Sequence, residues 1–115
     1  MKKAQFFIFI GIIAIAFCNP AYAATNNLRI ISLAPATTEI LFSLGLTDNI
    51  VGVTTFCNYP PQALRKEKIG SFSQPNIEKI LSLKPDLIFA ANIEQALIVS
   101  KLLKLGLNVV VSGPS

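Results

Sequence analysis

The sequence predicts an α/β fold, with a parallel sheet of about four strands flanked by helices. Short apolar runs alternate with amphipathic segments along the chain, and strands separated by helices pair in parallel through right-handed crossovers. Strands are expected over residues 29–33, 50–54, 86–91 and 108–112. These runs are almost continuously apolar and rich in β-branched residues, which is typical of strands buried on both faces of a sheet.

Three helices are marked by residues that favour their starts and ends. Pro35 suits the first turn of a helix after the first strand, because its φ is fixed and it lacks an N–H. Gly45 is expected to end that helix in the left-handed conformation, with the next residue folding back on the last turn. Asn76 should cap a second helix that stops at Pro85, and a third, amphipathic helix is expected over residues 93–105.

Two further observations concern the first helix and the second strand. Ile40, Leu41 and Leu44 recur at helical spacing, which supports a helix after Pro35. Gly52 interrupts the second strand, which indicates close approach of another backbone at that point.

Residues 1–23 have the pattern of a Sec signal peptide, which leaves residues 24–115 as the mature chain. Two lysines near the start are followed by an apolar run over residues 6–17, and Ala21 and Ala23 are the small residues that a signal peptidase recognises. The run is too short to span a bilayer comfortably. Lipid modification of Cys18 is the weaker alternative, because bulky Phe17 stands where a small residue is expected.

The charge of the mature chain argues against nucleic acid and anionic lipid as partners. The whole chain has ten basic and six acidic residues, and loss of Lys2 and Lys3 leaves eight against six, a net charge of about +2. So small and dispersed a charge predicts no polyanionic partner. The 92 residues that remain suffice for one small core or one lobe of a larger protein, and we expect a monomer.

The composition favours a binding protein over an enzyme. The sequence has no histidine, which removes the commonest general base and the commonest transition-metal ligand. Cys57 has no partner once the first 23 residues are lost, so we expect neither an internal disulfide nor a cysteine metal site. No G-x-G-x-x-G or Walker A pattern follows any strand. We therefore expect no catalytic residue, no metal site and no cofactor.

A long connection over residues 55–74 is the strongest candidate for a functional loop. Loops of this length usually carry function or are disordered, and the aromatic residues Phe56, Tyr59 and Phe72 argue against disorder. The connection begins at the carboxyl end of a strand, where open α/β sheets bind their ligands. Its charged run, residues 65–68, is expected to be a solvated face, and Cys57 is expected to be buried.

Several linked segments resemble the N-terminal lobe of the periplasmic cobalamin- and iron-siderophore-binding proteins of ABC importers. In order, they are RIISLAPATTEILFSLG, IVGVT, NYPPQA, NIEKILSLKPDLIFA and KLGLNVVV. The segment TTFCNYPP makes the resemblance strongest to the cobalamin-binding branch. The resemblance implies two α/β lobes joined by one long helix, with ligand held between them. It also implies that this chain, which closes on the loop-like Gly113-Pro114-Ser115, stops before the joining helix.

The resemblance assigns roles to four residues. Phe56 and Phe72 stand where cobalamin-binding proteins have aromatic residues that pack on the ligand, and Asn58 replaces an aspartate of the same loop. Ordinary core packing is the alternative for the two phenylalanines. Glu78 stands where the family has a glutamate that pairs with arginines of the membrane permease. Its alternative role is a favourable charge in the first turn of a helix.

The resemblance implies capture of cobalamin or a related corrinoid in the periplasm, and delivery to an ABC permease in the inner membrane. A second possibility in the same class is an iron siderophore or haem, to which Arg65 could contribute as an arginine clamp and Tyr59 as a haem ligand. A possibility of a different kind is a gene fragment that folds poorly and binds nothing. An enzyme is the least favoured interpretation.

We predict that the exported chain begins at Ala24. Mass spectrometry of the periplasmic protein should give the mass of residues 24–115. A mass that begins at Met1, or a lipid on Cys18, would contradict this prediction.

Overall fold

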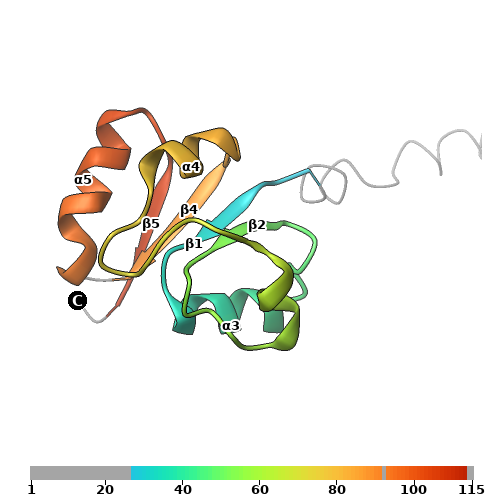
Figure 1. Cartoon of the computed structure of the whole chain (residues 1–115). Coiled ribbons are helices and arrows are strands. Elements are labelled where there is room, and N and C mark those ends of the chain that lie inside the picture. The colour runs from blue at the N-terminus through green and yellow to red at the C-terminus, as the bar shows by residue number, and fades with distance from the viewer. Residues whose placement is uncertain (1–26, 92, 114–115) are drawn as a thin grey trace, which may run out of the picture.

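A computed structural model describes residues 27–91 and 93–113, which form one parallel five-stranded sheet with helices on both faces (Figure 1). The strand order is β3-β2-β1-β4-β5, and every neighbouring pair is parallel. The strands are β1 (Ile30–Ser32), β2 (Ile50–Val53), β3 (Glu67–Lys68), β4 (Leu87–Ala91) and β5 (Val109–Ser112). The predicted α/β class is confirmed, and the predicted signal peptide lies outside the described residues.

The short strand β3 was not expected from the sequence. It pairs with the carboxyl half of β2, Gly52 opposite Glu67 and Val53 opposite Lys68. The charged run that contains it is therefore not simply a solvated face. The Lys66 ammonium donates to the Thr47 carbonyl at 2.6 Å, close to the start of β2. Charged side chains on a short edge strand also discourage pairing with other chains.

The helices cover the two faces of the sheet separately. They are α3 (Pro35–Ser43), α4 (Ile77–Ser82) and α5 (Ala96–Lys104), with two 3₁₀ helices, η1 (Pro61–Arg65) and η2 (Ile93–Gln95). Figure 1 shows α3 on one side of the sheet and α4 and α5 on the other, as right-handed crossovers in opposite directions require. The helix expected from residue 93 begins at Ala96, because the preceding three residues form the tighter turn η2.

No helix within residues 27–91 and 93–113 combines the length and the apolar character needed to cross a membrane.

The end of α3 confirms the predicted glycine stop. Gly45 has φ +80°, and its N–H donates to the Phe42 carbonyl at 3.0 Å. The N–H of Leu46 donates to the Leu41 carbonyl at 3.2 Å. These two bonds define a Schellman motif, which satisfies carbonyls that the helix end would otherwise leave without a partner.

Each face of the sheet has its own apolar cluster. On the α3 face the buried members are Ile30, Leu41, Phe42, Ile50, Val53, Cys57 and Ala63. On the α4 and α5 face they are Ile31, Leu33, Ile69, Ile80, Ile88, Ala90 and Leu102. Consecutive residues of β1 thus serve opposite faces, as a strand between two helical layers requires.

The apolar residues whose spacing indicated α3 do not together form its buried face. Leu41 is buried, but Ile40 is 58% and Leu44 is 68% exposed. The helix is rotated so that Thr37 and Thr38 face inward. The Thr38 hydroxyl donates to Ser32 Oγ at 2.8 Å, so this buried hydroxyl has a hydrogen-bond partner. The spacing of apolar residues alone gives no sign that a threonine is buried here.

The expectation for Gly52 also needs correction. A Cβ at this position would lie 2.9 Å from Leu83 Cδ1 and 3.0 Å from Ile69 Cγ2. The close neighbours are therefore side chains of the core on the α4 face, and not another backbone. Glycine is required here by packing across the sheet.

Candidate ligand-binding site

The three predicted ligand residues lie in connections that leave the carboxyl edge of the sheet. Phe56 and Asn58 follow β2, and Phe72 follows β3. The two connections meet, because the Thr55 N–H donates to the Gly70 carbonyl at 2.9 Å. The carboxyl edge of a parallel sheet is where ligands bind in open α/β folds. The structure thus brings the predicted residues to the expected edge.

The exposure of these residues helps to decide between ligand binding and ordinary core packing. Phe56 is 66% exposed, so it does not serve the core of this lobe. Asn58 is exposed, and Phe72 is half-buried. An exposed phenylalanine ring beside polar groups offers flat apolar area to a ligand. Ordinary core packing therefore does not explain Phe56, and ligand binding by these residues stays a prediction.

Cys57 fixes the segment that carries the exposed side chains. It is 1% exposed, which confirms the predicted burial. Its Sγ lies 3.0 Å from Thr54 Oγ1 and 3.1 Å from Thr38 Oγ1. The hydroxyl of Thr38 also donates to Ser32 Oγ, so one buried polar group joins the ends of β1 and β2 with α3. The residues on either side of Cys57 are held outward as a result.

Gln95 holds the other connection, and sequence reasoning missed it. Its side chain is buried, and Oε1 accepts from the Ala91 N–H at 2.8 Å. Nε2 donates to the carbonyls of Leu33 and Phe72, each at 2.9 Å. A signal was present in the sequence. Gln95 occupies the first position of the apolar stripe that continues through Ile98 and Leu102, where a polar residue needs buried partners.

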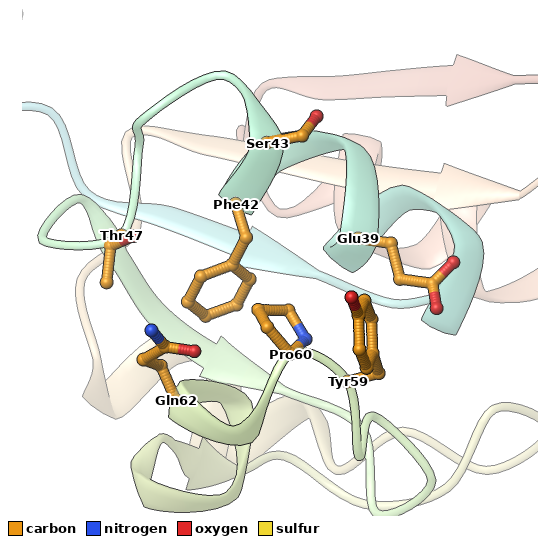
Figure 2. A pocket seen from close by; sticks show the side chains of 7 residues that line it. All are labelled: Glu39, Phe42, Ser43, Thr47, Tyr59, Pro60 and Gln62. Carbon is orange, nitrogen blue, oxygen red and sulfur yellow. The ribbon is translucent and has the colours of Figure 1, made fainter.

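An open groove of about 280 Å³ lies between α3 and the turn before η1 (Figure 2). It is lined by Glu39, Phe42, Ser43, Thr47, Tyr59, Pro60 and Gln62. None of the three predicted ligand residues lines it. Tyr59, the candidate haem ligand, faces this groove beside α3 and is 66% exposed. The groove and the exposed Phe56 are therefore separate features, and the position at the strand ends favours the second as the ligand site.

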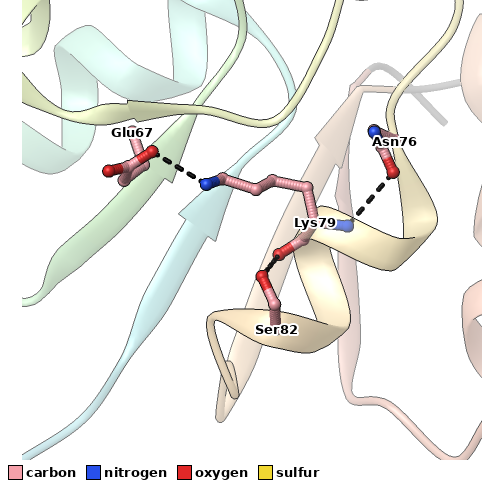
Figure 3. A network of polar contacts seen from close by, with 4 residues as sticks. All are labelled: Glu67, Asn76, Lys79 and Ser82. Carbon is pink, nitrogen blue, oxygen red and sulfur yellow. Dashed lines mark hydrogen bonds and ion pairs between the residues drawn. The ribbon is translucent and has the colours of Figure 1, made fainter.

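Glu78 lies in the first turn of α4, on the surface. The helix is capped by Asn76, whose Oδ1 accepts from the Lys79 N–H at 3.1 Å, as predicted. The ammonium of Lys79 pairs with Glu67 of β3 at 3.0 Å (Figure 3). Glu78 is exposed and takes no part in this network. Its carboxylate is free to serve a partner, while it also suits the positive end of the helix.

Arg65 precedes β3, whereas Phe72 of the candidate site follows it. Arg65 ends η1 two residues before β3 begins, and the neighbouring Lys66 contacts Thr47 at the start of β2. Arg65 therefore lies toward the amino edge, whereas Phe56 lies at the carboxyl edge. Within the described part of the chain, no three His, Cys, Asp or Glu side chains gather to hold a metal ion.

The family of the chain follows from a comparison with known families. The family described as periplasmic binding protein matches residues 30–115, which is most of the chain. The chain therefore belongs to the periplasmic binding protein family.

Individual relatives are vitamin B12-binding proteins. The Vitamin B12-binding protein of Vibrio cholerae serotype O1 is 56% identical over 62 residues, which cover 54% of this chain and 22% of that protein. The Vitamin B12-binding protein of Photorhabdus laumondii is 43% identical over 75 residues, which cover 65% of this chain and 26% of that protein. The chain thus spans about a quarter of the length of these curated relatives.

Solved structures agree on the fold. The periplasmic vitamin B12 binding protein BtuF of Vibrio cholerae matches with a TM-score of 0.71 and 45% identity, over 76% of this chain and 35% of that one. The periplasmic heme-binding protein RhuT from Roseiflexus matches with a TM-score of 0.66 and 29% identity, over 74% and 33%. The lobe fold is therefore shared by proteins named for different ligands.

Gly70 sets the path of the connection that carries Phe72, and we predict that Gly70→Ala is much more costly than Gly45→Ala. Both glycines have positive φ, +106° and +80°. A Cβ at Gly70 would lie 2.7 Å from the Gln74 carbonyl oxygen, whereas a Cβ at Gly45 would meet nothing within 4 Å. Gly45→Ala should lower the free energy of unfolding by about 1 kcal/mol, and Gly70→Ala by more than about 2 kcal/mol. Urea unfolding measures both, and equal losses would contradict the backbone clash.

Proposed function

We propose that this chain captures cobalamin or a related corrinoid in the periplasm and serves its delivery to an ABC permease. The observation that carries the proposal is the exposed ring of Phe56 at the carboxyl edge of the sheet. The similarity to vitamin B12-binding proteins over the same lobe supports the choice of ligand. Membership of the periplasmic binding protein family supports the compartment, and the predicted signal peptide would provide the route.

The chemistry of the three side chains fits a corrinoid. A corrin ring is broad, so it can pack against the flat faces of Phe56 and Phe72. The neutral amide of Asn58 can donate to and accept from the amide groups at the edge of the ring without a charge to desolvate. The two rings and the amide would recognise the shape and polarity of the corrinoid, and this does not require the protein to bind a metal ion of its own.

An iron siderophore or haem is the second candidate, since the RhuT structure is named for heme binding. Anionic iron chelates are commonly held by arginine clamps. The position of Arg65 toward the amino edge disfavours such a clamp at the candidate site. Tyr59 is exposed, but it lies in the groove beside α3 and not with Phe72.

One lobe offers only one side of a ligand site that the family resemblance places between two lobes. Affinity for a large ligand depends on burying most of its surface. We therefore expect residues 24–115 alone to bind weakly, and a longer form to bind tightly. A gene fragment that folds poorly and binds nothing is the alternative that the following experiment would reveal.

We predict that Phe56→Ala weakens binding of cyanocobalamin, while Leu64→Ala does not. Leu64 is a matched control, because it is 62% exposed on the same connection but lies in η1 toward the amino edge. Loss of a stacked aromatic ring costs about 1 kcal/mol beyond its area, so affinity should fall roughly fivefold or more. Calorimetry with cyanocobalamin and with a ferric siderophore measures the affinities.

Slow labelling of the buried Cys57 thiol confirms that each variant is folded. Phe72→Ala should weaken binding in the same direction. Equal affinities for Phe56→Ala and Leu64→Ala would remove Phe56 from the site. Tight binding of the ferric siderophore without binding of cyanocobalamin would replace the corrinoid by the second candidate.

We propose further that Glu78 meets an arginine of the permease, in a charge-assisted pair that aligns the lobe with the channel. Its exposed position in the first turn of α4 supports this role. Charges at the rim of an interface act mainly on encounter rate and register, and their effect weakens with salt.

We predict that Glu78→Arg reduces capture of the detergent-solubilised permease at low salt and leaves cyanocobalamin affinity unchanged. Glu39→Arg is the control, because Glu39 is also exposed and helical but lies on α3, across the sheet. Equal capture of the permease by the two variants would mean that Glu78 serves only as a favourable charge in the first turn of α4. Loss of cyanocobalamin binding with a normal melt would place Glu78 in the ligand site.

A further inference from the structure

We infer that Gln95 is a positioning residue, whose buried carboxamide holds the backbone of Phe72 against the carboxyl ends of β1 and β4. The inference rests on the proposed function, because it concerns how one of the two aromatic residues is presented to the ligand. It identifies a residue that touches no ligand itself and acts through Phe72.

The hydrogen bonds of Gln95 use both the nitrogen and the oxygen of its carboxamide. The side chain is 2% exposed, and its three partners are all backbone groups. Oε1 accepts from Ala91 at the end of β4, and Nε2 donates both to Leu33 just after β1 and to Phe72. Three segments that are far apart in the sequence are thus joined by one side chain. No buried side-chain nitrogen or oxygen in the described residues lacks a partner.

The geometry at position 95 favours glutamine over chemically similar residues. Glutamate has no N–H, and its carboxylate would face the carbonyl oxygens of Leu33 and Phe72. Asparagine is one methylene shorter and would not reach the same partners. Methionine has nearly the same shape, but it would leave one N–H and two carbonyls without partners in a buried place. Only a carboxamide of this length both donates twice and accepts once here.

The hydrogen bond from Gln95 affects binding by restricting the conformations of the segment around Phe72. The Gly70 carbonyl and the Ser71 hydroxyl hold the segment locally, the first through Thr55 and the second through the Gln74 N–H. The bond from Gln95 is what ties the Phe72 backbone to the sheet. A segment that is already ordered loses less conformational entropy when a ligand packs on it. Removal of the tie should therefore weaken binding through Phe72 and leave Phe56 in place.

The absence of tryptophan from the sequence makes this inference directly measurable. Phe72→Trp places a single fluorescent reporter at the position in question. In that background, Gln95→Met should shift the emission to longer wavelength, lower its anisotropy without ligand, and weaken cyanocobalamin binding by roughly tenfold in calorimetry. Gln74→Met is the matched control, because Gln74 is exposed on the same segment, and it should change neither the emission nor the affinity.

A second variant gives a signature that a purely structural residue would not give. Burial beside two carbonyls should raise the pKa of a carboxyl at this position. In the same background, Gln95→Glu should therefore resemble Gln95→Met at high pH, when the ionised carboxylate faces both carbonyls. At low pH the protonated acid donates one hydrogen bond, so the emission should return toward that of the parent. Labelling of Cys57 again reports whether each variant is folded.

The outcomes separate this inference from the proposed ligand. If neither Gln95→Met nor the pH titration of Gln95→Glu changes the emission, the positioning role is wrong, whatever binds. If the emission responds as expected but no form of the chain binds cyanocobalamin, the positioning role stands and the corrinoid proposal fails. A fall in melting temperature with unchanged emission and affinity would make Gln95 an ordinary core residue.

Discussion

The lobe depends on how the backbone is satisfied where β1 ends. A central parallel strand releases N–H and C=O groups at its carboxyl edge, and buried groups of this kind need partners. The Leu33 N–H donates to the Phe89 carbonyl of β4, and the Leu33 carbonyl accepts from Gln95. One residue earlier, Ser32 accepts from Thr38, whose hydroxyl also contacts Cys57. At this edge, side chains thus supply hydrogen-bond partners that neighbouring strands do not provide.

Two of these buried contacts have the same effect on the candidate site. Cys57 is held between Thr38 and Thr54, and it fixes the connection that exposes Phe56 and Asn58. Gln95 fixes the connection that carries Phe72. A backbone held in this way would let a ligand pack on Phe56 and Phe72 with little further ordering of the connections, as the proposed function requires. The same edge therefore gains stability from its buried polar groups, and under the proposed function the exposed ring of Phe56 would contact the ligand there.

Local rules predicted much of the fold, and the failures share a cause. Gly45 and Asn76 were predicted correctly because helix ends are decided within one turn of the chain. The short strand at Glu67 was missed because it depends on pairing with β2. The exposure of Ile40 and the burial of Thr38 depend on how α3 packs against other segments, which spacing along one helix does not reveal. Gln95 was missed for the same reason, as its partners lie up to 62 residues away. The burial of Cys57 was predicted from the sequence, whereas core packing of Phe56 beside it remained an alternative until the structure showed that Phe56 is exposed.

The most direct test of this account is to map a ligand onto the lobe by nuclear magnetic resonance. Amide spectra of residues 24–115, titrated with cyanocobalamin, should show shifts confined to the ends of β1, β2 and β4 and to the residues next to Phe56 and Phe72. Amides of the groove beside α3, such as Glu39 and Gln62, should stay unchanged. Shifts centred on that groove, or no shifts in a spectrum that shows a folded chain, would contradict the claim that the carboxyl edge of this sheet binds a corrinoid.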